Sequence, residues 1–454
     1  MIMDSKKVIY FYFIIALVLF SLQLPFGIYL ASSYALSYPQ WVVDLIPFST
    51  ARAVHTNLLV LWMLLGFMGG GYFIAMAEGG LNKIFSPFLA LLQLIILFIA
   101  GVTGIIGFFF GWTQGRPLLE LPFQMDLLVI LGAVIFLLNI TATMYRGWVQ
   151  NRKFSAISFI LLLGVIFTAL LYIPGIFFYK NITMDWTAWW VVIHLWVEGS
   201  WELIASAVLA FLLAVLTGVD RKAINKWLYI EAGLVLFTGI VGIGHHFYWT
   251  GHPDYWLWIG ASFSVLEPLP LLLMYWDAKR HLEHKPEFLS SLVGTLMFWS
   301  VVLHFIGAGV WGGFMTLPFV NYWTHGTQLT VSHGHLAFYG AFALLLFAVF
   351  YVLMSQFKGI KNLFEKRGVI SFKIMTGSMI AMTLFFLMAG TIQVCLERIA
   401  GWSYVEAQEW MRWWMGFAAI AGAGFAAGAA IMVYDLFFLK EKSLNSKSIY
   451  NRWR

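Results

Sequence analysis

The chain has 454 residues, of which 61% are hydrophobic and only 11% are charged. A soluble domain carries about 25% charged residues, so this composition excludes a soluble globular protein and indicates a polytopic membrane protein. The net charge of +6 does not predict nucleic-acid binding, because such an asymmetry belongs to the loops on one side of a bilayer.

Twelve apolar runs of about 20 residues or more are long enough to cross a membrane as helices. They predict an all-α integral membrane protein with twelve transmembrane helices, and short connections predict one integral domain over residues 1–454. The predicted helices cover residues 8–33, 52–77, 86–112, 125–147, 155–178, 187–217, 225–250, 255–278, 290–315, 330–356, 369–396 and 407–439.

The distribution of Lys and Arg predicts the orientation of these helices. With the amino terminus placed inside, 22 of the 27 basic residues fall in inner segments. The five outer ones are Arg52, Arg116, Lys180, Arg398 and Arg412. Because Lys and Arg concentrate on the cytoplasmic side of membrane proteins, both termini are predicted to be cytoplasmic.

The single cysteine, Cys395, limits the kinds of redox centre that the chain can hold. One thiol cannot form an internal disulfide, a zinc-finger site or an iron–sulfur cluster. The sequence also has no Cys-x-x-Cys-His signature of covalent haem attachment and no cysteine pair for a dinuclear copper centre. Any redox centre must therefore be held by other side chains.

The segment Trp189–Glu202, WWVVIHLWVEGSWE, places three ionisable side chains inside a predicted membrane helix. His194, Glu198 and Glu202 recur at four-residue steps, which on an α-helix puts them along one face. Ionisable groups at this depth are costly and usually belong to an ion path, a proton relay or a metal site.

Six of the eleven histidines are predicted to lie in the outer half of the bilayer, on four helices. They are His55, His194, His245, His246, His333 and His335. Six at one depth favour a metal or haem centre over a structural role, because neutral imidazole is the commonest metal ligand. The others are interpreted as loop or hydrogen-bonded structural residues: His252, His281, His284, His304 and His325.

The sequence spacing of these histidines predicts which of them can share a site. His333 and His335 are about 200° apart around a helix, so they face opposite sides and can hold two cofactors on its two flanks. His245 and His246 are adjacent at a helix end and can both reach one ion if that end unwinds slightly.

Two further side chains complete the second of these sites. His194 would join the adjacent pair to make a three-histidine site, and Glu198, one turn deeper, can add an oxygen ligand. Three nitrogens and one carboxylate favour iron over copper, which does not need the hard oxygen.

Five sequence blocks stand out along the chain: ARAVHTNLLVLWMLLGFMG, HLWVEGSWE, GIGHHFYW, SVLEPLP and HGTQLTVSHGHLAFYGA. In these blocks the chain resembles the large subunit of cytochrome-c-dependent nitric oxide reductase, a branch of the haem–copper oxidase superfamily. The blocks agree in order and spacing over nearly the whole chain. The resemblance implies a subunit of the bacterial inner membrane that reduces two nitric oxide molecules to nitrous oxide and water, with its metal site toward the periplasm.

The resemblance implies two b-type haems. His55 and His335 would be the axial ligands of a low-spin haem, and His333 the proximal ligand of a high-spin haem on the other side of the helix. On the outer side, Arg52 and Arg116 could pair with haem propionates, although interfacial snorkelling explains such arginines equally well.

The resemblance also implies a non-haem iron that faces the high-spin haem. Its ligands would be His194, His245, His246 and Glu198. Glu202 and Glu267 would be further buried acids near the iron, placed to relay protons or to balance charge. A structural carboxyl, hydrogen-bonded to a neighbouring helix, is the alternative for Glu202.

The implied electron donor is a membrane-anchored cytochrome c subunit on the outer face, while direct donation by quinol stays open. The family also has two glutamates in an outer loop, the first of which helps to bind calcium. This chain has Pro117 in that loop, without a side-chain ligand oxygen, which argues against calcium and leaves Glu120 as its candidate ligand.

Two rivals remain. A haem–copper oxygen reductase would share the histidines, although many of these enzymes have a tyrosine where Glu198 stands. A proton-coupled twelve-helix transporter would also use intramembrane Glu and His, but such folds usually show two related halves, and the HLWVEGSWE and HGH blocks are not repeated.

Overall fold

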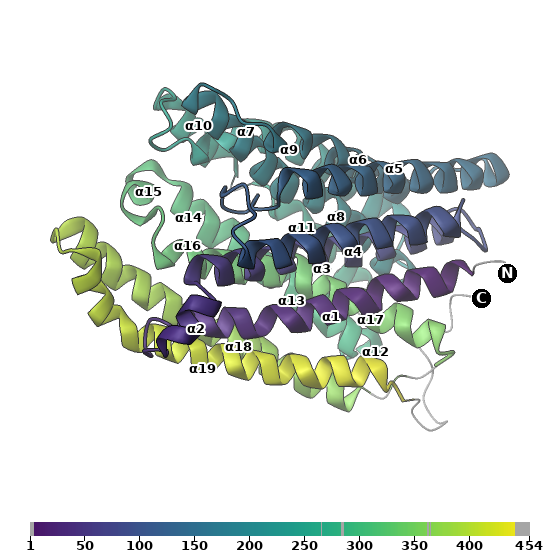
Figure 1. Cartoon of the computed structure of the whole chain (residues 1–454). Helices are drawn as coiled ribbons and strands as arrows, with labels where there is room; N and C mark the ends of the chain where they lie inside the picture. Colours follow the sequence, from purple (N-terminus) through teal and green to yellow (C-terminus); the bar gives the residue numbers. More distant parts are fainter. Residues whose placement is uncertain (1–3, 265, 283–285, 361–362, 364, 441–454) are drawn as a thin grey trace.

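The computed structural model describes residues 4–264, 266–282, 286–360, 363 and 365–440. Twelve helices in this part of the chain, between 21 and 36 residues long, are long and apolar enough to cross a membrane. They pack side by side as one bundle (Figure 1). The predicted all-α fold with twelve spans is confirmed.

The bounds of the helices lie within a few residues of the predicted ones. The first six spans are α1 (Ser5–Ser32), α3 (Phe48–Glu78), α4 (Pro87–Phe109), α5 (Phe123–Asn151), α6 (Ala156–Leu171) with the 3₁₀ turn η1 (Ile173–Ile176), and α7 (Ile182–His194), η2 (Leu195–Trp201) and α8 (Glu202–Thr217) as one span.

The other six spans complete the bundle. They are α9 (Arg221–Gly242) with η3 (Ile243–His246), α10 (Tyr255–Ser264) with α11 (Leu269–Leu282), α13 (Leu292–His304) with η4 (Phe305–Gly312) and α14 (Gly313–Thr316), α16 (Gln328–Phe338) with η5 (Tyr339–Ala343) and α17 (Leu344–Phe357), α18 (Lys366–Gln393) with η6 (Val394–Ile399), and α19 (Tyr404–Phe437). Short helices α2 (Gln40–Leu45), α12 (Pro286–Leu289) and α15 (Pro318–Thr324) lie between spans.

Local sequence explains where several spans begin. Ser86 caps α4 through a hydrogen bond from the Leu89 amide, and Pro87 occupies the first helical position, where its missing N–H costs nothing. Ser403 and Glu406 form a reciprocal capping box at the start of α19. The bilayer-length apolar runs then extend these helices.

Three spans form the centre of the bundle. In α3, in α7–η2–α8 and in α16–η5–α17, 89% of the most apolar window is buried, against 33% to 56% in the other spans. Inside a membrane the outer spans expose apolar side chains to lipid, so the three central spans are the ones that can carry polar groups shielded from lipid. These spans hold His55, His194 and the pair His333 and His335.

The two ends of the bundle differ. The start of α1 and the end of α19 lie at one end, which we call the inner end, whereas α2, α10 and α15 lie at the opposite, outer end (Figure 1). This agrees with the predicted common side for both termini. That the inner end faces the cytoplasm stays a prediction.

Within the described residues, four π-helical turns occur in the spans: η2, η4 and η5 inside them and η6 at the end of one. The segment Trp189–Glu202 is therefore not the regular α-helix that the four-residue spacing predicted. The α-helix ends at His194 and resumes at Glu202, with a wider turn between them. Such π turns are frequent at functional sites, because the wider turn re-aims the side chains that follow it.

Candidate metal centre

One cavity of about 760 Å³ connects most of the residues that the sequence singled out. Its lining includes His55, His194, His245, His246, His333, His335, Glu198, Glu202, Glu267 and Arg52. This volume is in the range of binding sites for small molecules and cofactors. The helices therefore bring residues from distant parts of the chain around one internal space.

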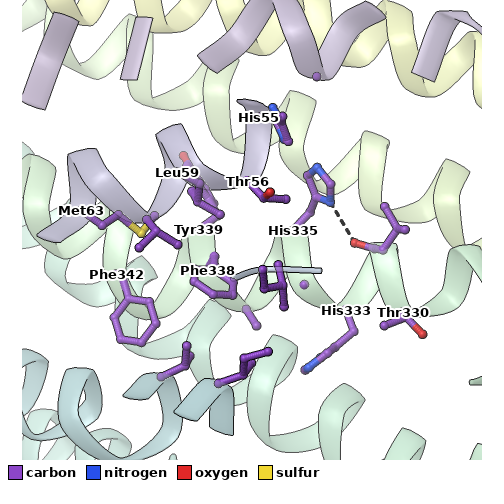
Figure 2. A pocket seen from close by; sticks show the side chains of 18 of the residues that line it. His55, Thr56, Leu59, Met63, Thr330, His333, His335, Phe338, Tyr339 and Phe342 are labelled. Carbon is purple, nitrogen blue, oxygen red and sulfur yellow. Dashed lines mark hydrogen bonds between the residues drawn. The ribbon is translucent and has the colours of Figure 1, made fainter. Parts of the chain in front are cut away.

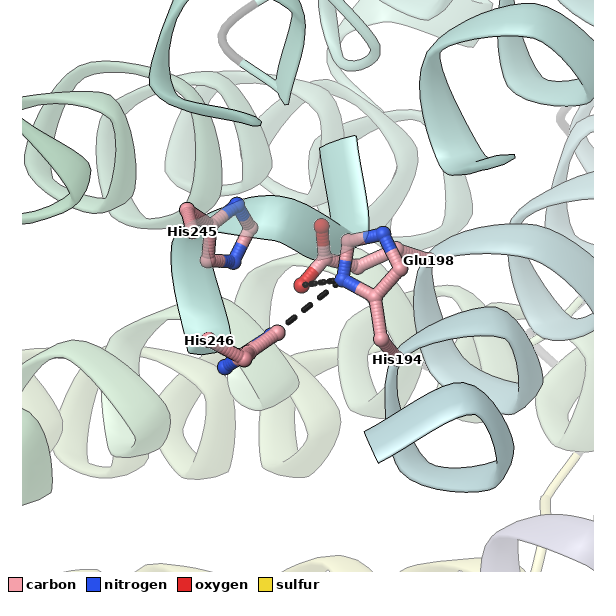
Figure 3. A group of neighbouring side chains, drawn as sticks. All are labelled: His194, Glu198, His245 and His246. Carbon is pink, nitrogen blue, oxygen red and sulfur yellow. Dashed lines mark hydrogen bonds and ion pairs between the residues drawn. The ribbon is translucent and has the colours of Figure 1, made fainter. Parts of the chain in front are cut away.

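Four side chains at one wall of this cavity form a compact cluster (Figure 3). His194, Glu198, His245 and His246 each offer one ligand atom, and these four atoms lie within 4.8 Å of one another. His194 Nδ1 lies 3.3 Å from Glu198 Oε1 and 3.2 Å from His246 Nε2. Atoms at these separations can surround a single metal ion.

Neighbouring groups fix the orientation of the cluster. The Nε2 atom of His194 lies 2.9 Å from the carbonyl oxygen of Gly239, which can only accept, so Nε2 carries the proton and Nδ1 presents a lone pair to the cluster. Ser264 Oγ donates to Glu198 Oε2 at 3.2 Å, and Trp190 stacks on the His246 ring with centroids 4.1 Å apart. Metal-binding histidines are commonly held in this way through their other nitrogen.

The chemistry of the cluster fits a metal cation. His245 Nδ1 is buried and has no hydrogen-bond partner among the described residues. Lone pairs of imidazole nitrogens and of the carboxylate point toward one another here. They repel each other unless a proton or a cation lies between them. Imidazole ligands suit iron, copper and zinc, and the carboxylate oxygen of Glu198 adds a harder ligand.

The end of α9 differs from the sequence expectation. The helix tightens into the 3₁₀ turn η3, which includes His245 and His246, rather than unwinding. The two rings still lie close together, with centroids 4.1 Å apart, and each lies 5.1 Å from the His194 ring. Tightening of the last turn therefore brings both rings to the cluster.

A second site lies between α3 and α16 (Figure 2). The rings of His55 and His335 are nearly parallel, at an interplanar angle of 24°, with centroids 6.2 Å apart. His55 Nδ1 contacts the carbonyl oxygen of Gln23 at 3.2 Å, and His335 Nδ1 contacts that of Val331 at 2.8 Å, so the Nε2 atom of each ring is free to bind. Two imidazoles that bind one metal at about 2 Å place their centroids about 6 Å apart, which fits a bis-histidine haem.

His333 points to the other side of α16 from His335, as the spacing predicted (Figure 2). Its Nδ1 contacts the carbonyl oxygen of Gly307 at 2.9 Å, which again leaves Nε2 free. Glycines make room for two of the rings. A Cβ atom on Gly312 would lie 2.8 Å from His333 Cε1, and one on Gly27 would lie 2.6 Å from His55 Cε1.

The buried acids do not join the ligand cluster. Glu202 lies beyond the π turn, and its Oε1 is 3.3 Å from Nε2 of His304. Glu267, in the break between α10 and α11, accepts a hydrogen bond from Thr238 Oγ1 at 2.8 Å. His304 was interpreted as a structural histidine because it has no ionisable neighbour in sequence, but in space its neighbour is Glu202.

Sequence reasoning missed one acid. Glu231 lies in the middle of α9 and is 1% exposed. The rule that marked Glu198 also applies to this residue, because an ionisable side chain inside a predicted span is costly. No second acid and no histidine lies at helical spacing from Glu231 in the sequence, so the sequence pattern did not single it out.

In the outer loop between α4 and α5, Glu120 and Arg116 both contact side chains from other parts of the chain. Glu120 is buried, and it accepts from Asn57 Nδ2 at 2.9 Å and lies 3.5 Å from Arg52. Burial raises the pKa of Glu120, whereas the hydrogen bond from Asn57 and the charge of Arg52 lower it. Arg116 pairs with Asp185 at 2.5 Å. The candidate calcium ligand is thus already engaged by N–H donors, and Arg116 is held by another carboxylate.

The other histidines outside the cluster are placed as follows. His252 contacts Thr187 Oγ1 and Thr250 Oγ1 at 2.9 Å and 2.7 Å, and His325 contacts Asn321 at 3.2 Å. His281 belongs to the last turn of α11, not to a loop, and His284 lies outside the described residues.

Comparison with known proteins shows the family to which the chain belongs. Residues 7–424 match the family described as cytochrome c and quinol oxidase polypeptide I. The chain belongs to this family, within the haem–copper oxidase superfamily. The fold is shared with a cryo-EM structure of a haem–copper terminal oxidase dimer, at a TM-score of 0.72 and 17% identity over 96% of this chain and 84% of that chain.

Among curated relatives, one branch of the superfamily is far more similar. A nitric oxide reductase subunit of Stutzerimonas stutzeri is 39% identical over 95% of this chain and 94% of its own length. The cytochrome c oxidase subunit 1 homolog of Azorhizobium caulinodans is 23% identical over 88% of this chain and 76% of its own length. The resemblance to the nitric oxide reductase subunit is confirmed.

Proposed function

We propose that this chain is the catalytic subunit of a nitric oxide reductase, in which two nitric oxide molecules, two electrons and two protons give nitrous oxide and water. The observation that carries the proposal is the position of Glu198, whose carboxylate lies among three histidine nitrogens within 4.8 Å. A carboxylate in this set favours iron over copper. The identity of 39% with the nitric oxide reductase subunit of Stutzerimonas stutzeri supports the same conclusion.

We infer a place for each group from the histidines and the carboxylate around the cavity. His55 and His335 would hold the low-spin haem b, and His333 would hold the high-spin haem b. The non-haem iron would be held by His194, His245, His246 and Glu198. When bound, the two irons of the site supply electrons and act as Lewis acids toward the oxygens of the substrate.

The chain's own side chains supply the rest of the chemistry. Gly239 and Ser264 hold His194 and Glu198 in place, and most other side chains that line the cavity are apolar. Glu202 and Glu267 would deliver the two protons, because both are buried and both line the cavity. A carboxyl held at this depth can give up a proton where the negative charge of the product develops.

The proposal includes the setting of the enzyme. Residues 1–454 would act as one integral domain of a bacterial inner membrane, with both termini cytoplasmic and the metal centre toward the periplasm. A membrane-anchored cytochrome c subunit on the outer face would deliver electrons, since the chain has no covalent haem or copper motif of its own. We propose no calcium ion, because Asn57 and Arg52 already engage Glu120.

An optical spectrum and a metal count on the purified protein test the proposal, together with gas analysis after nitric oxide is added under reducing conditions. Two b-type haems, one further iron, no copper and nitrous oxide production would support it. One copper per chain with oxygen consumption would instead make the protein an oxygen reductase. A protein without haem would overturn the assignment and favour a transporter.

A further inference from the structure

One stripe of side chains along α7 faces η3 and the loop that follows it. Its members recur at steps of three or four residues, which places them on one face of the helix. They are Thr183, Thr187, Trp190 and His194. At the end of the stripe nearest the cluster, His194 lies beside His246, and Trp190 stacks on the same ring. The two threonines contact the loop beyond η3.

That loop turns back on itself. Trp249 has a positive φ of 54°, and Gly251 follows with one of 83°. For a residue with a side chain the left-handed region is unfavourable, so it persists only where other contacts hold the backbone. The turn brings His252 back over Phe247, and their rings stack with centroids 3.9 Å apart. The shape of the loop therefore depends on contacts with neighbouring segments.

His252 bridges this loop to α7. Its Nε2 lies 2.9 Å from Thr187 Oγ1 on the helix, and its Nδ1 lies 2.7 Å from Thr250 Oγ1 in the loop. Beside this bridge, Thr183 Oγ1 donates to the carbonyl oxygen of Thr250 at 2.8 Å. Two hydrogen bonds thus join the loop to α7, and a third joins the His252 ring to its own loop.

The hydroxyl groups determine which nitrogen of His252 carries a proton. Thr187 donates its one hydroxyl proton to the carbonyl oxygen of Thr183 at 2.6 Å, so its oxygen accepts from His252 Nε2. Burial lowers the pKa of His252, and in the neutral ring Nδ1 then accepts from the Thr250 hydroxyl. Both nitrogens are therefore used, by two different segments, which holds these segments at one separation.

The bridge lies close to the metal ligands along both segments. Thr187 precedes His194 by seven residues, which is two turns along the same face of α7, and His252 follows His246 by six residues. The two ligands lie 3.2 Å apart although they belong to different spans (Figure 3). Such a contact needs the two spans to stay together, and the bridge joins them just beyond the ligands.

We propose that His252 is a positioning residue of the metal cluster, because it ties the loop after η3 to the helix that carries His194. The inference rests on the proposed function only for the identity of the ion. His252 acts through the loop rather than as a ligand. It keeps His245 and His246 at the distance from His194 that a single ion requires. Without the bridge the loop moves away from α7, and the ion is bound less tightly.

Removal of iron from the purified holoprotein by a chelator tests the proposal. His252→Phe keeps a ring that can stack on Phe247 but removes both nitrogens. It should weaken iron binding about 10-fold, the lower end of the effect of groups that orient metal ligands. The optical spectrum of the proposed haem at His55 and His335 should stay unchanged, which would exclude a general loss of structure. Unchanged iron binding would overturn the proposal.

Thr187→Val covers the case in which His252→Phe does not assemble. Valine has the shape of threonine without the hydroxyl, so this variant removes the α7 end of the bridge and should also weaken iron binding. In the double variant the loss should equal that of His252→Phe alone, because both changes break the same bond. Additive losses would show that the two residues act separately and would overturn the bridge.

The matched control for the threonine variant is Thr391→Val. The Thr391 hydroxyl also donates to a carbonyl of its own helix, that of Leu387 at 2.8 Å, but on an exposed face of α18. Iron binding in this variant should equal that of the unchanged protein. A loss as large as that in Thr187→Val would mean that the bridge is not its cause.

Hydrogen exchange tests the bridge without the ion. In His252→Phe the backbone amides of residues 247–252 should exchange faster than in the unchanged protein, because the loop has lost its tie to α7. Exchange at the unchanged rate would overturn the proposal. If the unchanged protein holds copper in place of iron, the proposed function fails, whereas the release of that copper and the exchange of the loop still decide the role of His252.

Discussion

The two proposed metal-binding regions of the molecule involve the two sides of α16 and are built differently. At His55 and His335, both rings are turned by backbone carbonyls through Nδ1, and their centroids lie 6.2 Å apart with no acid between them. In the four-residue cluster, His194 is turned the other way, through Nε2, and Glu198 lies beside its Nδ1.

If the proposed groups are bound, this difference would separate electron transfer from substrate chemistry. Two histidines on opposite sides of one iron occupy both axial positions and leave none for a substrate. A cluster of three nitrogens and one oxygen on one wall of a cavity leaves the cavity side of the ion open. The first arrangement therefore suits a relay of electrons and the second suits a reaction.

The largest expected effect comes from the cluster. His194→Ala removes the nitrogen that lies beside both Glu198 and His246, so the non-haem iron should fall from one per chain to none. Nitrous oxide production should drop by more than about 100-fold, since changes outside the ligand set alone cost 10–100-fold. Metal analysis checks the iron, and a retained low-spin haem spectrum serves as the control.

The second prediction concerns the other flank. His55→Ala should lower the haem content from two to one per chain by removing an axial ligand, while the iron of the cluster remains. Turnover with a cytochrome donor should then be lost, because the haem proposed to accept electrons from the donor would be missing. Retention of both haems would show that the ring spacing of 6.2 Å does not mark a haem site.

Glycine substitutions should separate the two flanks without touching a ligand. Gly27→Ala would press on His55 and Gly312→Ala on His333, because the added Cβ lies 2.6 Å and 2.8 Å from those rings. Overpacking of this kind costs about 1–3 kcal/mol, so we expect partial loss of the low-spin haem in the first variant and of the high-spin haem in the second.

The control for this pair lies on the exposed face of α18. Gly377 has no atom within 4 Å of an added Cβ and is not part of the cavity lining, so Gly377→Ala should keep both haems. Optical spectra of the three variants make the measurement. Equal loss of both haems in either of the first two variants would mean that the two flanks are not independent.

A smaller effect should follow from the hydrogen bond to Glu198. Ser264→Ala removes the donor that lies 3.2 Å from Glu198 Oε2 and leaves all four ligands in place. Support of this kind changes metal affinity by about 10–100-fold, so iron should be lost at a lower chelator concentration than in the unchanged protein. Ser262→Ala, on an exposed hydroxyl of the same helix, is the control.

The smallest effect should come from calcium removal. Because Asn57 donates to Glu120 Oε2 and the positive charge of Arg52 lies 3.5 Å from Oε1, a calcium chelator should leave the haem spectra and the turnover unchanged. Recovery of lost activity by added calcium would contradict this expectation and would restore the calcium site that the family pattern suggests.

Much of this arrangement could be predicted from the sequence. Bilayer-length apolar runs determine the twelve spans, and the two-residue spacing of His333 and His335 is enough to place them on opposite sides of one helix. The adjacency of His245 and His246 likewise brings both to one end of α9. Properties that depend on one helix and its period are therefore readable from the chain.

Contacts between distant spans could not be predicted in the same way. His304 and Glu202 are 102 residues apart, and Glu231 of α9 accepts from Ser206 of α8, so no local pattern joins the partners. The break between α10 and α11 was also missed, although Pro268 and Pro270 pointed to it. Pairings of this kind depend on how the helices pack.

The π turn between His194 and Glu202 has a consequence for how the chain can change. Each residue of an α-helix turns the chain by about 100°, so deleting one residue within Leu195–Trp201 would swing α8 by that angle relative to α7. His194 would keep its place while Glu202 left His304. The positions of Glu202 and of the four-residue cluster are thus coupled by the length of a single turn, which should tolerate substitutions far better than insertions or deletions.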